Sequence, residues 1–315
     1  MMSFAFVFPG QGSQSVGMMA AYTANEKDAA VVRAVFSEAS NALGEDLWEM
    51  VASGSSETLA QTVNTQPVML TAGVAVWRLW QAKGGKNPAC LAGHSLGEYS
   101  ALVAAEVLTF ADTVPLVRLR AAAMQEAVPL GSGGMAAIMG LEDEAVHAAC
   151  AAASAETGGV AEAVNFNAVG QTVIAGHKQA VERAMELCKE KGAKRALALP
   201  VSAPFHASLM RPAAEKLAVA LEKTEFRPPK IPVINNVDVA VESTPEKIRD
   251  ALVRQAYRPV RWVEIIRRMA AEGVGQVVEC GPGRVLAGLA KRCADGVTGI
   301  ALADAAALEA NLTLE

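Results

Sequence analysis

Long uncharged apolar runs are missing from this 315-residue chain, although hydrophobic residues make up 52% of it. A membrane-spanning helix needs about 18 or more such residues in a row, so we expect none. The apolar segment at residues 4–8 is too short for a secretory signal, and no basic residues precede it. Charged residues are few (19%) and the net charge is −5, which argues against nucleic-acid binding through a broad basic surface.

Cysteine pairs and metal-binding spacings are also absent from the sequence. The five cysteines form no C-x-x-C motif and are odd in number, so we expect free, mostly buried thiols in a reducing cytoplasm. The four histidines show no paired spacing of the kind that binds zinc. These residues are Cys90, Cys150, Cys188, Cys280, Cys293, His94, His147, His177 and His206.

Short apolar strands alternate with longer helical patterns along the first 127 residues. The pattern predicts strands at residues 4–8 and 89–92 and helices at 67–81 and 97–107. Such alternation favours a parallel sheet covered on both faces. Thr109 and Asp112 have the spacing of a capping box that opens a helix running towards residue 128. Pro115 lies about one turn inside that helix, where we expect a kink or a shifted start.

Glycines at residues 131–134 interrupt this rhythm and indicate a domain boundary. Residues 135–199 then follow the order β-α-β-β-α-β, which is the ferredoxin-like pattern. After Pro200 the earlier alternation resumes, with strands predicted near residues 231–235 and 276–279. We therefore predict an α/β fold with two domains. Residues 1–128 and 200–315 form a large α/β-hydrolase-like domain with a central parallel sheet, and residues 129–199 form a small ferredoxin-like α+β domain.

Residues 93–97 (Gly-His-Ser-Leu-Gly) match the G-x-S-x-G pattern of a nucleophile elbow. The pattern alone is common, but here it lies between an expected strand and an expected helix, which is the context that an elbow requires. Flanking glycines let neighbouring backbone pass, and the helix N-terminus favours developing negative charge. We predict that Ser95 is the nucleophile of an acyl-transfer reaction, and that the adjacent His94 has a supporting role.

A serine nucleophile needs a base, and His206 is the leading candidate. It lies on a proline-bearing loop (residues 202–206) where the chain re-enters the large domain, and such crossovers often border clefts. A packed loop histidine is the alternative. His147 and His177 lie in or beside helical patterns, where we expect surface residues.

Two further segments contain candidate binding residues. The glycine-rich loop at residues 9–14 lacks the phosphate-binding motifs, so Gln11 is either a ligand of an oxyanion or part of a plain turn. Arg118 and Arg120 are two residues apart on one helix and must face different sides. One of them is expected to point inward, where it needs a carboxylate from the protein or from a substrate.

Together these motifs resemble the malonyl-CoA:acyl carrier protein transacylase family of bacterial fatty-acid synthesis. Each motif is modest evidence, but their order and spacing span almost the whole chain. The motifs are residues 8–14, 93–98, 118–120 with 124–125, 165–167 with 170–171, 202–206, 235–238, 253–255 with 259–262, and 281–283.

The resemblance implies roles for individual residues. It implies a Ser95–His206 pair whose histidine is oriented by the main-chain carbonyl of Gln255, without a carboxylate. It implies an oxyanion hole formed by the N–H groups of Gln11 and Leu96. Arg120 would bind the malonyl carboxylate, and Phe205 would disfavour a methyl branch on it. The implied reaction transfers malonyl from malonyl-CoA to acyl carrier protein through an ester on Ser95, without a metal or redox cofactor.

The implied carrier protein is acidic, and a basic cluster in the small domain is a candidate docking site. The cluster consists of Lys189, Lys191, Lys194 and Arg195. A solvated helix end is the alternative for it. We expect a cytoplasmic monomer in fatty-acid biosynthesis that binds neither nucleic acid nor membrane. A serine hydrolase on a related sheet, or a non-catalytic carrier-binding subunit, are the competing functions.

Overall fold

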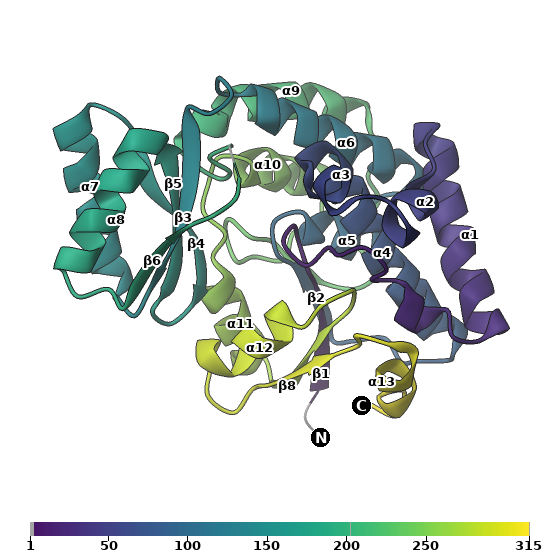
Figure 1. The fold of residues 1–315 in the computed structure, drawn as a ribbon. Helices are drawn as coiled ribbons and strands as arrows, with labels where there is room; N and C mark the ends of the chain where they lie inside the picture. Colours follow the sequence, from purple (N-terminus) through teal and green to yellow (C-terminus); the bar gives the residue numbers. More distant parts are fainter. Residues whose placement is uncertain (1–2, 202, 315) are drawn as a thin grey trace.

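Two sheets of different kinds organise the protein, as Figure 1 shows for a computed structural model that describes residues 3–201 and 203–314. The larger sheet has five parallel strands in the order β7-β2-β1-β8-β9 within these residues. Its strands are β1 (Ser3–Phe8), β2 (Cys90–Gly93), β7 (Val233–Ile234), β8 (Val274–Glu279) and β9 (Thr298–Ala301). The predicted central parallel sheet is confirmed.

Helices cover both faces of this sheet. Successive side chains of β1 point to opposite faces, so they enter two separate hydrophobic cores. Phe4, Phe6 and Phe8 belong to the larger core, where Phe6 packs 5.0 Å from the ring of Trp80. Ala5 and Val7 belong to the second core. The larger core includes residues of α1 (Glu26–Leu43), α2 (Leu47–Ala52), α3 (Ser56–Ala60), α4 (Thr62–Ala82), α5 (Gly97–Ala104), α6 (Phe110–Glu126), α9 (Arg211–Lys223), α10 (Pro245–Gln255) and α13 (Ala305–Ala310), and the second core includes α11 (Trp262–Ala271) and α12 (Val285–Cys293).

The start of α6 agrees with its predicted capping box. The Thr109 hydroxyl accepts the N–H of Asp112, and the helix begins at Phe110. Pro115 therefore lies inside the helix and does not shift its start, which was one of the two expected effects. The helix predicted at residues 67–81 begins five residues earlier, at Thr62, so that Pro67 also lies inside a helix.

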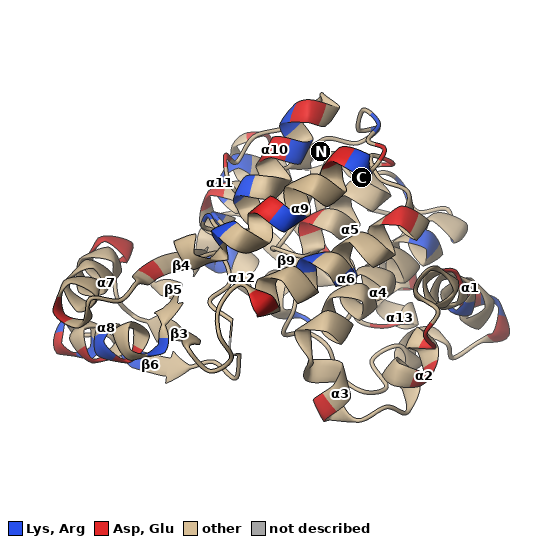
Figure 2. Ribbon diagram, turned by 90° about the horizontal axis from the view of Figure 1, so that it is seen from above, with Lys and Arg blue, Asp and Glu red and all other residues tan. Residues whose placement is uncertain are grey.

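The smaller sheet is antiparallel and has the strand order β4-β5-β3-β6. Its elements follow the predicted order β-α-β-β-α-β, and α7 and α8 pack together against the sheet (Figure 1). These elements are β3 (Gly133–Met139), α7 (Asp143–Thr157), β4 (Ala161–Ala168), β5 (Gln171–His177), α8 (Lys178–Glu190) and β6 (Arg195–Ala198). From above, this part stands to one side of the main body (Figure 2).

The backbone of β4, in the smaller sheet, pairs with the segment just before α11, which belongs to the larger part of the molecule. Val260 donates its N–H to Val164 (2.9 Å) and accepts the N–H of Phe166 (3.0 Å), which joins the parts without a continuous sheet. All five cysteines are free and buried. Within the described residues, no helix has both the length and the apolar character that crossing a membrane would require.

Candidate active site

Ser95 lies in the tight turn between β2 and α5, with its backbone in the left-handed region (φ +52°). A Cβ on Gly93 would lie 1.8 Å from the carbonyl carbon of Gly97, and a Cβ on Gly97 would lie 2.1 Å from the oxygen of Phe8. Only glycine fits at both positions, since such contacts are sterically forbidden. The amide of Ser95 is fixed from outside the turn, because it donates to Oδ1 of Asn236 (2.8 Å).

The structure brings Ser95 and His206 together, although 111 residues separate them. Ser95 Oγ lies 2.7 Å from His206 Nε2, and His206 Nδ1 lies 2.7 Å from the main-chain oxygen of Gln255. A carbonyl only accepts hydrogen bonds, so Nδ1 carries the proton and Nε2 offers its lone pair to the serine hydroxyl. His206 also has a left-handed backbone (φ +67°). Ser202, at the start of the predicted loop motif, lies outside the described residues.

The His206 imidazole is almost completely buried, with 3% of its surface exposed. Burial, reinforced by the positive charge of Arg120, lowers its pKa from 6.5 to about 3. It is therefore neutral near pH 7, which is the form that accepts a proton. Among the described residues, no carboxylate lies within hydrogen-bonding distance of the ring.

Arg120 is buried (2% exposed) and points at Ser95 from α6. Its guanidinium donates to Gln66 Oε1 (2.8 Å), Gln255 Oε1 (3.0 Å) and Ser95 Oγ (3.2 Å). All three acceptors are neutral, and across residues 3–201 and 203–314 no carboxylate forms an ion pair with it. Arg118 faces the other way, as the spacing predicted, and pairs with Glu45 at 2.7 Å. A buried cation without an anion is suited to an incoming carboxylate.

The loop after β1 lies directly against the elbow. A Cβ on Gly10 would lie 2.5 Å from the carbonyl oxygen of His94 and 3.8 Å from the nitrogen of Leu96. The side chain of Gln11 bonds to Thr62 (3.2 Å), but in the described part of the chain the main-chain N–H groups of Gln11 and Leu96 have no hydrogen-bond partner. Two free N–H groups on adjoining turns are candidate donors to an oxyanion.

Other predicted residues lie at or near this site. Phe205, half-buried, packs against both the larger core and a small core at the sheet junction. His94 Nε2 lies 2.7 Å from Oδ1 of Asn167 on β4, which suits a supporting role. His147 is exposed, as expected, whereas His177 is half-buried and its Nδ1 accepts the N–H of Val160.

Four polar residues of the site had no role in the sequence analysis: Gln66, Glu98, Asn167 and Asn236. Glu98 did carry a signal, since it is an acidic residue within an otherwise apolar stretch. The two asparagines lie inside the motifs at residues 165–167 and 235–238, but nothing in the pattern says what they contact. Gln66 has no sequence signal at all, because its role depends on how α4 packs beside α6.

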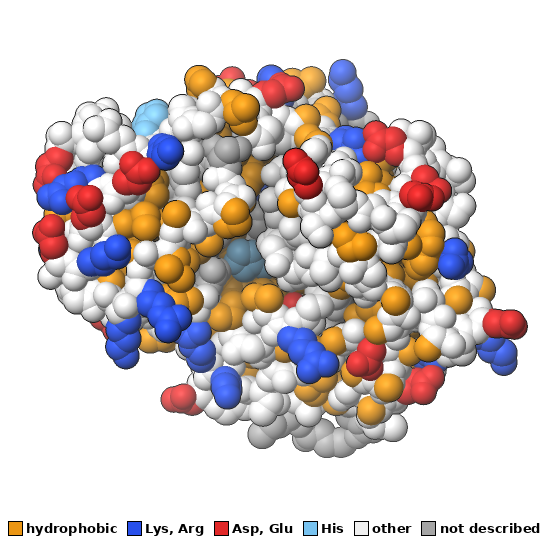
Figure 3. All heavy atoms as spheres, viewed as in Figure 1, with side chains coloured by type: hydrophobic (Ala, Val, Ile, Leu, Met, Phe, Trp, Pro, Cys, Tyr) orange, Lys and Arg blue, Asp and Glu red, His pale blue; other side chains and the backbone are white. Residues whose placement is uncertain are grey.

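The site opens into a hollow between the two parts of the molecule, where Figure 3 shows a histidine at the base. A cavity of about 400 Å³ adjoins His206 and is also lined by Arg211, Tyr257 and Arg258. Lysine and arginine side chains gather beside the hollow over β6 and α12 (Figure 3). The predicted basic cluster of Lys189, Lys191, Lys194 and Arg195 is exposed, and none of the four forms an ion pair with a described residue.

Residues 5–308 match the family model of the acyl transferase domain. The malonyl CoA-acyl carrier protein transacylase of Salmonella typhimurium is 58% identical over 313 residues, covering 99% of this chain and 100% of that protein. The acyl-carrier-protein S-malonyltransferase of Burkholderia pseudomallei has the same fold, with a TM-score of 0.95 and 59% identity, covering 99% of this chain and 100% of that one. The chain belongs to the acyl transferase family and, within it, to the malonyl CoA-acyl carrier protein transacylases.

A third relative has been solved with a partner. It is a malonyl-transacylase in complex with a type II polyketide synthase acyl carrier protein. It is 54% identical to this chain, with a TM-score of 0.95, and covers 98% of this chain and 99% of its own.

Proposed function

We propose that this protein transfers the malonyl group from malonyl-CoA to the phosphopantetheine thiol of an acyl carrier protein, through an ester on Ser95. The observation that carries the proposal is the buried guanidinium of Arg120, which has no carboxylate partner in the described chain and lies 3.2 Å from Ser95 Oγ. A generic serine hydrolase has no need of such a cation beside its nucleophile. Acyl groups with a free carboxylate neutralise it, whereas an acetyl group leaves it unpaired.

In the first step, Ser95 Oγ attacks the thioester carbonyl while His206 Nε2 takes the hydroxyl proton. The carbonyl oxygen becomes an oxyanion that accepts the N–H groups of Gln11 and Leu96, and Arg120 holds the malonyl carboxylate. The tetrahedral species then collapses, the carbon–sulfur bond breaks, and His206 returns the proton to the departing CoA sulfur. Gln255 keeps the imidazole in the required tautomer throughout.

In the second step, the carrier thiol gives its proton to His206 and attacks the malonyl ester, and Ser95 recovers the proton as it leaves. The exposed basic cluster at the end of α8 and the start of β6 supports docking of an acidic carrier there. Phe205, packed against the junction core, supports preference for an unbranched malonyl group. We place the reaction in fatty-acid biosynthesis in the cytoplasm, where five free thiols remain reduced.

Mass spectrometry tests this proposal. The protein is mixed with malonyl-CoA, the reaction is stopped, and peptides containing Ser95 are examined for a malonyl ester. Holo carrier proteins of fatty-acid and polyketide synthesis are then added separately. We expect an ester on Ser95 and its transfer to the fatty-acid carrier. Release of free malonate at a comparable rate would support a hydrolase, and a folded protein without an ester would contradict the proposal.

A further inference from the structure

The side chain of Gln255 connects the nucleophile to the cation. It is fully buried, and its Oε1 accepts from Arg120 Nη2 (3.0 Å). Its Nε2 donates to the main-chain oxygen of Ser95 (2.9 Å) and to Glu98 Oε2 (2.9 Å). The amide is thus a fixed spacer, with its oxygen against a cation and its nitrogen against acceptors.

Glu98 is a buried acid that takes no part in the two transfer steps. It is 2% exposed, and Oε2 also accepts the main-chain N–H of Asn236 (2.9 Å), the residue that holds the amide of Ser95. Burial raises the pKa of Glu98 to about 7. In either protonation state Oε2 keeps lone pairs for both donors, because the proton can reside on Oε1.

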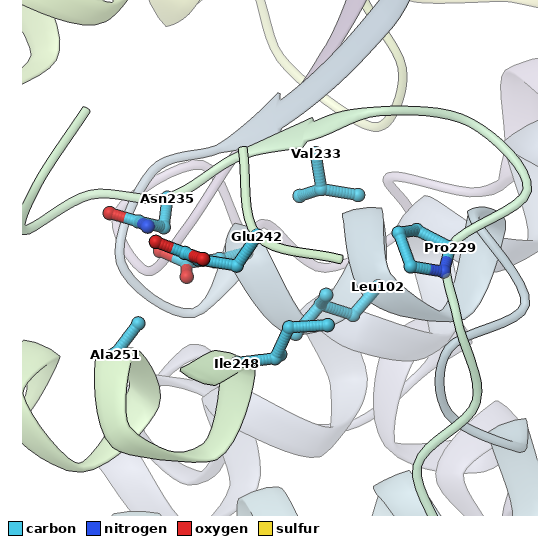
Figure 4. A pocket seen from close by; sticks show the side chains of 8 residues that line it. Leu102, Pro229, Val233, Asn235, Glu242, Ile248 and Ala251 are labelled. Atoms are coloured by element: carbon cyan, nitrogen blue, oxygen red, sulfur yellow. The ribbon is translucent and has the colours of Figure 1, made fainter. Parts of the chain in front are cut away.

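Glu98 also lines a cavity of about 10 Å³, room for about one water molecule. Leu102 and Ile248 line it together with Glu242, as Figure 4 shows, and Glu242 pairs with Lys247 at 3.6 Å. Glu98 is therefore held within the core, with its Oε2 turned to the site and not to solvent.

These contacts allow only one orientation of the Gln255 amide. If the amide turned over, its NH₂ group would face the Arg120 guanidinium, and its oxygen would face both the Glu98 carboxyl and the main-chain oxygen of Ser95. These contacts would be repulsive, donor against donor and acceptor against acceptor. Without the Glu98 acceptor, the Ser95 oxygen alone holds the amide nitrogen, so the amide gains freedom to turn away from Arg120.

We propose that Glu98 is a positioning residue for malonyl selectivity, which orients the Gln255 amide so that its oxygen holds Arg120 beside Ser95. The inference rests on the proposed function, because selectivity here means the preference for malonyl-CoA over acetyl-CoA. If the Gln255 amide loses its orientation, acylation by malonyl-CoA slows and acylation by acetyl-CoA does not, because the acetyl group has no carboxylate for Arg120 to bind.

The test compares the kcat/KM values for Ser95 acylation by malonyl-CoA and by acetyl-CoA in three variants. Glu98→Met removes the acceptor, Glu98→Asp withdraws it by about 1.5 Å, one carbon–carbon bond, and Glu98→Gln keeps both its reach and an acceptor oxygen. We expect the malonyl-to-acetyl ratio to fall about tenfold or more in the Met and Asp variants, the effect of one lost buried hydrogen bond. In Glu98→Gln we expect a ratio within about threefold of wild type, because an acceptor oxygen remains.

Glu279 supplies the matched control. It is also a fully buried glutamate, at the end of strand β8, and it accepts the N–H of Ala287 in α12. Glu279→Gln should lower the melting temperature and leave the ratio unchanged. If Glu98→Met does not fold, the malonyl-to-acetyl ratio of Glu98→Asp decides between the two outcomes. An unchanged malonyl-to-acetyl ratio in a folded Glu98→Met or Glu98→Asp variant would overturn this inference alone. An equal fall of the ratio in Glu98→Gln and Glu279→Gln would do the same. Wild-type protein that transfers no malonyl group would contradict the proposed function instead.

Discussion

At the scale of single residues, the proposed reacting pair has strained backbone angles but well-bonded neighbours. Ser95 and His206 both have positive φ angles, which cost about 1–3 kcal/mol each for residues other than glycine. Each is held by a buried neighbour: Asn236 binds the amide of Ser95, and the Gln255 carbonyl binds the His206 ring. The surrounding fold therefore fixes the hydroxyl and the imidazole 2.7 Å apart.

Replacing Arg120 by alanine tests the cation at this scale. We expect Arg120→Ala to reduce kcat/KM for malonyl-CoA by at least about 100-fold, the loss of a charge-assisted pair of hydrogen bonds. Acetyl-CoA turnover should rise relative to malonyl-CoA turnover, because no buried cation is left unpaired. Steady-state kinetics with both substrates measure this, and Arg118→Ala on the outer face of the same helix is the control. Equal losses for the two substrates would contradict the role of Arg120.

The pH dependence of acylation follows from the lowered pKa of His206. Protonation disables the base only as the pH falls towards about 3, well below the ordinary value of 6.5. We therefore expect a flat rate of Ser95 acylation between about pH 5 and 7, measured by rapid quench. Glu98 titrates near pH 7, so Glu98→Gln protein is measured in parallel. An acidic limb centred near pH 6.5 in both proteins would show that His206 is protonated more readily than its burial implies.

Part of this site was predictable from sequence and part was not. Ser95 was predictable because the elbow has a local steric signature, and the inward turn of one arginine followed from helical spacing. The contacts of Gln66 and Asn236 were not, because each depends on how separate elements pack. The sequence left open whether the inward arginine meets a carboxylate of the protein or of a substrate, and within the described residues its acceptors are neutral oxygens.

At the scale of elements, the loop after β1 is in close contact with the elbow, next to the proposed oxyanion hole. Gly10 allows the two turns to touch, and Gln11 and Leu96, the proposed oxyanion donors, follow on these two turns. The helix dipole of α5 adds to the positive potential there. A small displacement of one turn against the other would separate the two donors.

Gly10→Ala tests this contact. The new Cβ would lie 2.5 Å from the His94 oxygen, so the β1 loop must move. We expect the acylation rate to fall by about 100-fold, as a shift of about 1 Å in a donor does, and the free energy of unfolding to fall by about 1–3 kcal/mol. Rapid-quench kinetics and urea unfolding measure the two effects. Gly288→Ala on α12, with nothing within 4 Å, is the control and should retain full activity.

Whole elements were predictable to different degrees. The helix at 110–126 had a capping signal, and the strands and helices of the small sheet followed the ferredoxin-like order. Helices α1, α9 and α12 and strand β9 were not predicted, and β7 has only two paired residues where five were expected. Pairing at the edge of a sheet depends on the neighbouring strand, here β2, and not on local residue preference.

At the scale of the whole molecule, charge is distributed unevenly around the hollow. The protein is acidic overall, yet lysines and arginines gather beside this opening (Figure 3). Such a local patch steers an acidic partner without making the entire surface basic.

Reversing two charges of the basic cluster tests the docking surface. We expect Lys191→Glu with Lys194→Glu to raise KM for the acyl carrier protein about tenfold at low salt, since like charges oppose docking, and to leave acylation by malonyl-CoA unchanged. The control makes the same charge change at Lys27 and Lys223, which are exposed on α1 and α9. Equal effects of the two double variants would attribute the change to net charge, and no effect of either would exclude the cluster.

The path of the chain between the two sheets also constrains when the protein becomes active. Ser95 precedes the small sheet, His206 follows it, and the carbonyl that orients His206 belongs to Gln255 at the end of α10. During synthesis the chain emerges from its N-terminus onward, and domains generally fold as units in that order. A nascent chain that has folded its small sheet therefore exposes a serine without its base. The base and the carbonyl that orients it are complete only after about four-fifths of the polypeptide has been made, so products truncated before Gln255 lack this arrangement.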